Sequence, residues 1–486
     1  KSNHTFVHMK AFEIVIGLEV HIRLATKTKL FSSDSAEYGG IPNGHTSVLT
    51  LAHPGTLPML NASAVRMAIK LGLACHCTIN PFSYFARKHY FYPDSPKGFQ
   101  TTQHTAPICI GGYLSLSTGK KIHIHHIHLE EDAAKSLHDQ EPGFTWIDYN
   151  RAGTPLMELV TEPCIESADD AAAFVSELHR LVQWIEVSDG NMEEGSLKCD
   201  VNISARKAGD TLLGTKVEIK NVNSIRNIRK AASVEAERLI GCLQSGEKII
   251  QQTRSFDANT DTTFSLREKE EANDYRYFPE PDLPPIHLSE AYIESVRASL
   301  PELPQALIER LKEQYQLNDY DATQISLDKK AVQYFEKINL FTNQSKQAAN
   351  WINGAIKQYL NDGGFEFDAF PIAPEKIADI IHLIESNTIS HTAATSRLFP
   401  ALISEPSADV ESLANSLNII QISDANELTE WVQQAIDKMP DKVLAYQKGK
   451  KGLIGLFMGE VKKISGGKAD AQITLQLLEE KLNQKL

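Results

Sequence analysis

The feature that most constrains the fold of this chain is a two-residue alternation of apolar and polar side chains in its first 280 residues. In residues 13–23, five aliphatic residues hold the even positions, and the odd positions include Glu13, Glu19, His21 and Arg23. Successive side chains of a β-strand point to opposite faces of a sheet, so this spacing predicts a strand with one apolar and one polar face. The alternation recurs in residues 157–162, 196–204 and 216–220.

These segments predict an antiparallel sheet with one face on a hydrophobic layer and the other face open and lined with acids. The open face would carry Glu19, Glu158, Asp200 and Glu218. Solvent exposure alone explains one acidic strand, but it does not explain four from distant parts of the chain. Clustered carboxylates repel one another unless a cation neutralises them. Carboxylates with one imidazole suit Mg²⁺ or Mn²⁺, so the pattern indicates a divalent-metal site.

Residues 121–132 add a run rich in histidines and acids to this face. Strict alternation predicts that His123 and His125 face opposite to His126 and His128, a spacing unsuited to a zinc site. Glu130 and Glu131 are adjacent, so only one of them can readily join the acidic face. Alternation leaves open which one does.

Two basic segments combine cations with aromatic residues, as sites for phosphates and bases often do. They are residues 87–94, which begin with Arg87 and Lys88, and residues 274–280, which contain Arg276. Core aromatics with a surface ion pair are an equally good interpretation of either segment alone. P-loop, dinucleotide and nucleophile-elbow motifs are all missing from the sequence.

Four prolines between residues 279 and 285 mark a break after the strand-rich region. Beyond it, apolar spacings of three and four predict helices over residues 307–315, 331–335, 348–360 and 374–386. We expect a catalytic domain over residues 10–289, a helical domain over 290–408 and a small helical tail domain over 409–486.

The whole chain carries a net charge of −13, which argues against a general DNA-coating protein. Residues 441–486 nevertheless hold nine lysines and five acids, a local net charge of +4. This inversion favours either an RNA-contacting module or a solvated helical surface. No apolar run is long enough to span a membrane, and the polar first residues lack a secretory signal. Six cysteines without a CxxC pair indicate a reducing compartment, so we expect a cytoplasmic protein.

Several motifs together resemble the B subunits of the tRNA-dependent amidotransferases, the GatB/GatE family. They are residues 17–21 (GLEVH), 89–94 (HYFYPD), 129–132 (LEED), 150–156 (NRAGTPL), 192–202 (MEEGSLKCDVN) and 274–282 (DYRYFPEPD). The motifs follow the family's order over nearly the whole chain. The chain has no room for the extra inserted domain of the archaeal E-type proteins, which favours the B type.

The resemblance implies an α+β fold, with an N-terminal cradle like glutamine synthetase and guanido kinases. An all-α middle domain and a YqeY-like tail that binds tRNA follow. It implies a carbon–nitrogen ligase that uses ATP and Mg²⁺ to phosphorylate the side-chain carboxyl of Glu-tRNA(Gln) or Asp-tRNA(Asn). Ammonia that an amidase partner releases from glutamine then displaces phosphate. The amidase (GatA) and a small third protein (GatC) complete the expected heterotrimer, and neither DNA nor a membrane is an expected partner.

Matched residue by residue, the resemblance implies specific roles on the acidic face. Glu131 is favoured there over Glu130. Lys88 and Lys198, with Arg87, would offset charge on the transferred phosphoryl group, and Lys88, Asn202 and Arg276 would bind ATP. The implied metal ligands are Glu19, His21, Glu131, Glu158 and Asp200.

Two other functions are compatible with the residues. One is a tRNA-binding scaffold with its ATP chemistry elsewhere, although carboxylates in the cleft argue against RNA binding there. The other is a stand-alone metal-dependent ligase or nuclease, which would not need the basic tail.

Overall fold

The computed structural model describes residues 11–138, 140–268, 275–421 and 425–483. Residue 10, where the predicted catalytic domain starts, and Asp274 of the second basic segment lie outside the described residues. The chain divides into two compact units at Leu303 and Pro304. The domain boundaries at 289 and 408 stay predictions.

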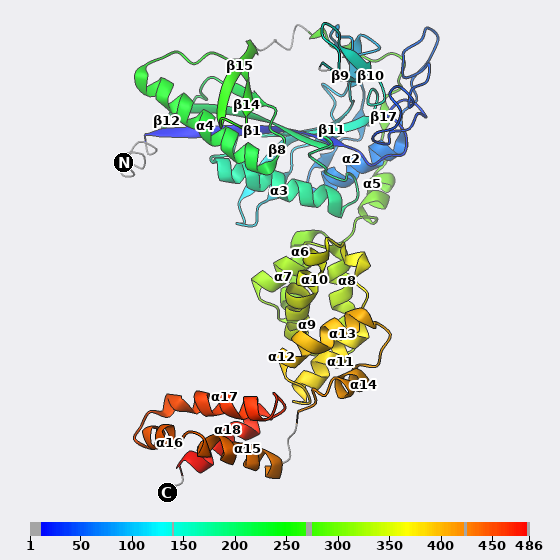
Figure 1. The fold of residues 1–486 in the computed structure, drawn as a ribbon. Coiled ribbons are helices and arrows are strands. Elements are labelled where there is room, and N and C mark those ends of the chain that lie inside the picture. Colours follow the sequence, from blue (N-terminus) through cyan, green and yellow to red (C-terminus); the bar gives the residue numbers. More distant parts are fainter. Residues whose placement is uncertain (1–10, 139, 269–274, 422–424, 484–486) are drawn as a thin grey trace. The chain divides into compact units, whose positions relative to one another are not determined.

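The first unit is built on a large sheet (Figure 1). Its main path runs in the order β15-β14-β13-β12-β1-β11-β8-β5-β4-β16. The pairings are antiparallel, as expected, except that β13 and β14 are parallel. In chain order the strands of this path are β1 (Phe12–Arg23), β4 (Ala86–His89), β5 (Phe99–Thr102), β8 (Lys121–Glu131), β11 (Pro155–Thr161), β12 (Leu197–Lys207), β13 (Val217–Lys220), β14 (Gln252–Asp257), β15 (Thr262–Glu268) and β16 (Phe278–Pro279).

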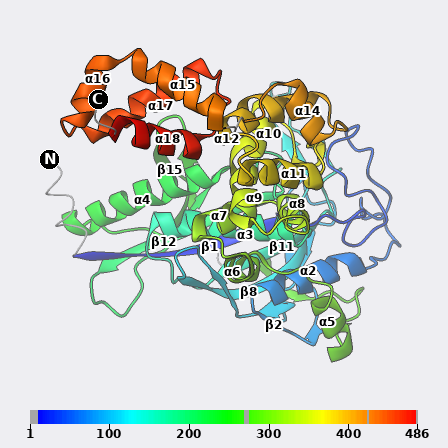
Figure 2. The same ribbon diagram turned by 90° about the horizontal axis from the view of Figure 1, so that it is seen from below.

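Helices α2 (Ala62–Ala74), α3 (Ala168–Trp184) and α4 (Ile225–Ser245) cover one face of the sheet (Figures 1 and 2). The aliphatic residues at the even positions of β1 bury against this layer, from Ile16 to Ile22 at 1% exposure or less. Ser167 and Ser224 begin α3 and α4 by accepting hydrogen bonds from backbone N–H groups of the first turn. The apolar face thus forms the core, which leaves the polar residues of the central strands on the opposite face.

Strand β8 departs from strict alternation. Ile122 and Ile124 are buried, and so are Ile127 and Leu129, three and five residues after Ile124. A β-bulge opposite Val160 and Thr161 absorbs the extra residue. Before the bulge the even-numbered residues of β8 face the core, and after it the odd-numbered residues do. The prediction that His123 and His125 face opposite to His126 and His128 is therefore wrong.

The second unit, Pro304–Leu486, is helical in its described residues. The four helices expected after the prolines are present, as α6 (Pro304–Tyr315), α8 (Lys329–Ile338), the continuous run Ser345–Gly363 and α11 (Pro374–Glu385).

The tail has its own hydrophobic cluster, which includes Val432, Phe457 and Leu478. It is built from α15 (Ala425–Asp437), α16 (Pro440–Gln447), α17 (Ile454–Ile464) and α18 (Ala471–Asn483). In the part of the chain that is described, no helix has both the length and the apolar character to cross a membrane.

Candidate active site

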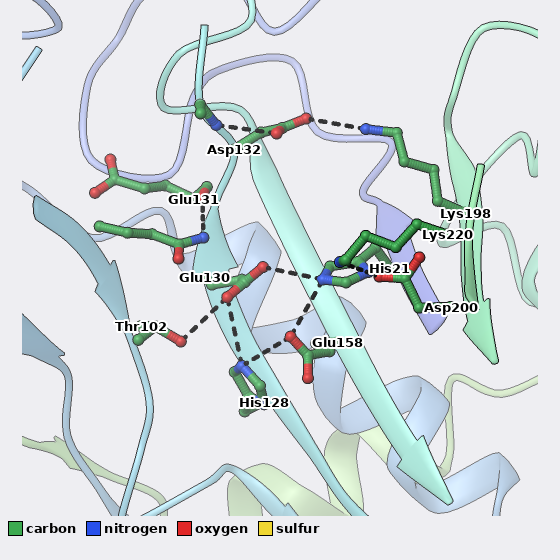
Figure 3. Close-up of polar contacts among 12 residues, drawn as sticks. His21, Thr102, His128, Glu130, Glu131, Asp132, Glu158, Lys198, Asp200 and Lys220 are labelled. Carbon is green, nitrogen blue, oxygen red and sulfur yellow. Dashed lines mark hydrogen bonds and ion pairs between the residues drawn. The ribbon is translucent and has the colours of Figure 1, made fainter. Parts of the chain in front are cut away.

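Three neighbouring strands bring two histidines and two glutamates together on the open face (Figure 3). His21 of β1 lies opposite Glu158 of β11, and Glu158 lies opposite His128 of β8. The His21 Nε2 atom is 3.2 Å from Glu158 Oε2 and 3.7 Å from Glu130 Oε1. The His128 Nε2 atom is 3.6 Å from Glu130 Oε2 and 3.8 Å from Glu158 Oε2. We call His21, Glu130 and Glu158 the histidine–glutamate cluster.

A second cluster adjoins it on β1, β12 and β13. Glu19 lies opposite Asp200, and one oxygen each of Glu19, Asp200 and Glu218 lie within 4.8 Å of one another. We call these three residues the carboxylate cluster. Asn202 donates a hydrogen bond to Glu19 at 2.8 Å, and Lys220 Nζ is 2.8 Å from Asp200.

Protonated side chains balance the charge of both clusters. Burial opposes the charge on His21, but the hydrogen bond to Glu158 and the nearby carboxylates outweigh it and raise the pKa of His21 to about 9. Burial also opposes the charge on Lys220, yet Asp200 and Glu218 raise its pKa. The pKa of Glu158 is lowered, because His128 and His21 outweigh the effect of its burial.

Both clusters have the donors that a hard divalent cation prefers. One offers two carboxylates and an imidazole, and the other offers three carboxylates. The Asn202 Oδ1 atom, beside the carboxylate cluster, is buried and has no hydrogen-bond partner among the described residues. An unsatisfied buried acceptor beside acidic side chains fits a position that a cation or a donor ligand completes.

Glu131, one of the expected metal ligands, does not join either cluster. Its Oε1 atom accepts from the backbone N–H of Thr101 at 2.8 Å and pairs with Lys97 Nζ. Glu131 and Lys97 line a separate cavity of about 310 Å³. Adjacent residues of a strand point to opposite faces, and here Glu130 points to the open face with His21 and Glu158.

Two of the expected cations lie near the clusters. Lys198 lies opposite His21 in the β1–β12 register, and its Nζ is 4.0 Å from Asp132 Oδ2. Lys88 Nζ lies 4.8 Å from the centre of the Tyr275 ring and helps to lower the pKa of Glu158. Arg276 is exposed and has a positive φ of 46°, a strained conformation for a side chain of this size.

Arg87 is engaged elsewhere. Its guanidinium binds Glu280 through two nitrogens, at 2.8 and 2.7 Å, and contacts Asp282 at 3.1 Å. Glu280 is 6% exposed, and β16 pairs with β4 at the same point. A bidentate pair of this kind holds the proline-rich segment onto the sheet edge, which favours a structural role for Arg87 over contact with a phosphate.

An aromatic pair borders the histidine–glutamate cluster; Tyr277 belongs to the second basic segment, whereas His104 was not singled out from the sequence. Tyr277 stacks on His104, with ring centres 3.9 Å apart and planes within 7°. Burial, with Glu130 and other nearby groups, raises the pKa of Tyr277, so its hydroxyl stays protonated. His104 follows the strand β5 and Tyr277 precedes β16, and only the sheet order brings them together.

Comparison with known proteins covers both units of the chain. A model of the GatB/GatE catalytic domain matches residues 14–294, and a GatB domain model matches residues 333–482. The first match alone covers more than half of the chain. The chain belongs to the GatB/GatE family.

Curated relatives of the family match almost end to end. The chain is 44% identical over 479 residues to the B subunit of the aspartyl/glutamyl-tRNA(Asn/Gln) amidotransferase of Ectopseudomonas mendocina, covering 97% of this chain and 99% of that protein. It is 42% identical over 470 residues to the protein of the same name from Thermodesulfovibrio yellowstonii, at 96% and 98% coverage. Both clusters and the ion pair between Arg87 and Glu280 lie inside the segment that matches the GatB/GatE catalytic domain.

Proposed function

We propose that this GatB-type chain works in an aminoacyl-tRNA amidotransferase and that its open sheet face activates the side-chain carboxyl of Glu-tRNA(Gln) or Asp-tRNA(Asn). The observation that carries the proposal is the pair of adjoining clusters within the segment that matches the GatB/GatE catalytic domain. We further propose that the sheet follows the glutamine synthetase and guanido kinase architecture and that the tail is YqeY-like. The proposed partners are the glutaminase GatA and the small protein GatC, with glutamine as the nitrogen donor.

In the proposed reaction, one oxygen of the substrate carboxylate attacks the γ-phosphorus of ATP, and the bond to the β-phosphate oxygen breaks to release ADP. Ammonia then attacks the activated carbonyl carbon, the bond from that carbon to the phosphate-bearing oxygen breaks, and phosphate and a proton leave. A carboxylate needs this activation because oxide is a very poor leaving group. With little covalent work for the protein to do, positioning and charge neutralisation are its main contributions.

The location of each residue on the open face suggests its role in metal binding, charge neutralisation or positioning. His21, Glu130 and Glu158 would hold one Mg²⁺, and Glu19, Asp200 and Glu218 a second cation with ATP. Bound Mg²⁺ would supply charge neutralisation at the phosphate oxygens. Lys88 and Lys198 reach the same face and would offset charge on the transferred phosphoryl group. Asn202 is proposed to orient Glu19, to which it donates a hydrogen bond.

The test is reconstitution with GatA, GatC, Glu-tRNA(Gln), ATP, Mg²⁺ and ammonium chloride. We expect Asp200→Asn to abolish both ADP and Gln-tRNA formation, because it removes a carboxylate from the carboxylate cluster. The glutaminase activity of GatA should remain, which controls for assembly. Synthesis by the variant at the wild-type rate would place the chemistry elsewhere and leave this chain as a tRNA-binding scaffold. Synthesis by the isolated chain would instead support a stand-alone ligase.

A further inference from the structure

A chain of imidazoles leads along β8 to the histidine–glutamate cluster. His125 Nδ1 is 2.6 Å from His126 Nδ1, and His126 Nε2 is 3.1 Å from His128 Nδ1. The rings of His126 and His128 stack, with centres 5.1 Å apart and planes at 21°. His128 then reaches Glu130 and Glu158 through its other nitrogen. The bulge in β8 makes His125 an extra residue next to His126, and ordinary alternation places His126 and His128 on one face of the strand.

The spacing of the inner pair is close to that of two ligands on one metal ion. Zinc binds imidazole nitrogen at about 2.0–2.1 Å with tetrahedral geometry, which separates two ligand nitrogens by roughly 3.3 Å. The observed separation of His126 Nε2 and His128 Nδ1 is 3.1 Å. Rotating the two rings so that both lone pairs point to one ion would therefore need little change in the distance between the nitrogens.

The outer nitrogens of both rings already have polar neighbours. His128 Nε2 lies beside carboxylate oxygens of Glu130 and Glu158, and His126 Nδ1 lies against His125. Metal-bound histidines usually donate their second N–H to such a group, which fixes the tautomer and the ring orientation.

We propose that His126 and His128 chelate a transition-metal ion of the Zn²⁺ class, through Nε2 and Nδ1 respectively, beside the histidine–glutamate cluster. Water or buffer ligands would complete the coordination. Imidazole pairs select zinc, nickel and copper, whereas Mg²⁺ prefers oxygen, so the two neighbouring sites would discriminate between metals by their donors. The distances along β8 carry this site.

Occupancy of this site inhibits the activity proposed above, and this part of the inference rests on that proposed function. Zinc held by His126 and His128 places a second positive ion next to the proposed magnesium site, and the two ions repel each other.

The binding test uses the full chain in excess Mg²⁺, so that oxygen-rich sites are filled, and titrates it with Zn²⁺ against a competing indicator. We expect His126→Asn to weaken the tightest zinc site by at least about tenfold, because asparagine lacks the distal nitrogen. His123→Asn is the matched control, on the same strand but in contact with Tyr113 rather than the other histidines. Its zinc affinity should equal the wild-type value. Equal affinity of His126→Asn and wild type would overturn the site.

Anomalous diffraction at the zinc edge provides a second readout that needs no activity. A peak between His126 and His128 supports the proposal, and a peak only at other histidines overturns it. In the reconstituted reaction, zinc should inhibit wild type and the His123 variant at concentrations that leave His126→Asn active. If zinc binds at His126 but the reaction is not seen at all, the proposed function fails while the metal site stands.

Discussion

At the scale of single residues, protonated side chains offset part of the negative charge on the open face. His21 and Lys220 each lie among carboxylates that keep them protonated. Within the histidine–glutamate cluster, His21 lies within 4 Å of Glu158, and beside the carboxylate cluster Lys220 lies within 4 Å of Asp200. A bound divalent ion would take over this neutralisation. The same neighbours that raise the pKa of His21 are the oxygens that would bind the metal.

Glu130 and Glu131 are adjacent in sequence but lie in different surroundings, which separates their roles. Glu130→Gln removes a carboxylate from the histidine–glutamate cluster. We expect it to raise the Mg²⁺ concentration needed for half-maximal synthesis by about tenfold or more. Glu131→Gln should leave that concentration unchanged and reduce the free energy of unfolding by about 1–3 kcal/mol, since Lys97 loses its buried partner. Magnesium titrations and denaturant melts of both variants check this, and the reverse pattern would restore Glu131 as the ligand.

Lys29 gives the chain a defined dependence of stability on pH. It is fully buried, which lowers its pKa from 10.5 to about 8, although Asp34 and other acids partly compensate. Between these values the unfolded chain holds a proton that the folded chain lacks, so the free energy of unfolding rises with pH. Relative to Lys29→Met, the free energy of unfolding of wild type should rise by up to about 1.4 kcal/mol per pH unit in this window and stay constant below it. Urea melts of both proteins from pH 7 to 10 measure the difference, and a constant difference would contradict the assignment.

At the scale of elements, the sequence of β8 itself accounts for its bulge, because His125 is the extra residue between two alternating halves. Removing His125 leaves a strictly alternating strand, so we expect this deletion variant to fold with a melting temperature near that of wild type. Removing Ile127 instead turns His126 toward the helices and loses one buried isoleucine, at a cost of about 2–5 kcal/mol. Thermal unfolding of the two single-residue deletions distinguishes them. Equal destabilisation would mean that the bulge itself is required for folding.

The strands and their acidic face follow from alternation, because the period of two is a local property of the sequence. The sequence also contained the signal that places Glu130 on the open face. The aliphatic residues hold even positions up to Ile124 and odd positions from Ile127 onward, so the later even positions face away from the core. Other features depend on distant pairing. The contact of Arg87 with Glu280 joins residues 193 apart, and the parallel pairing of β13 with β14 follows the intervening helix α4. No local pattern could have located these.

At the scale of the whole molecule, the basic tail has its own core and can be tested separately. The lysines Lys462 and Lys463 are exposed on α17, above the cluster that contains Phe457. We expect Lys462→Ala with Lys463→Ala to raise the KM for aminoacyl-tRNA. It should reduce the slope of log KM against log salt by roughly 1–2, while the KM for ATP stays unchanged. An unchanged salt slope would mean that these lysines only keep the surface hydrated.

Removing residues 425–486 should have a similar but larger effect on tRNA. Because the hydrophobic cluster of the tail is made from its own helices, we expect the truncated chain to keep the melting transition of residues 11–303. Loss of that transition would contradict an independent tail.

The edge of the large sheet has a consequence for the synthesis of the chain on the ribosome. Strand β4 pairs with β16, and β3 (Phe82–Ser83) pairs with β17 (Ile286–His287). In each pair the second strand is synthesised about 200 residues after the first, so the first strand stays unpaired until then. At about 5–20 residues per second, the wait is roughly 10–40 s. During that time the backbone of β4 presents one unpaired edge, a template for association with another nascent chain. The proline-rich segment therefore completes the fold late, and we expect slow translation or chaperone binding over this interval to govern the yield of folded protein.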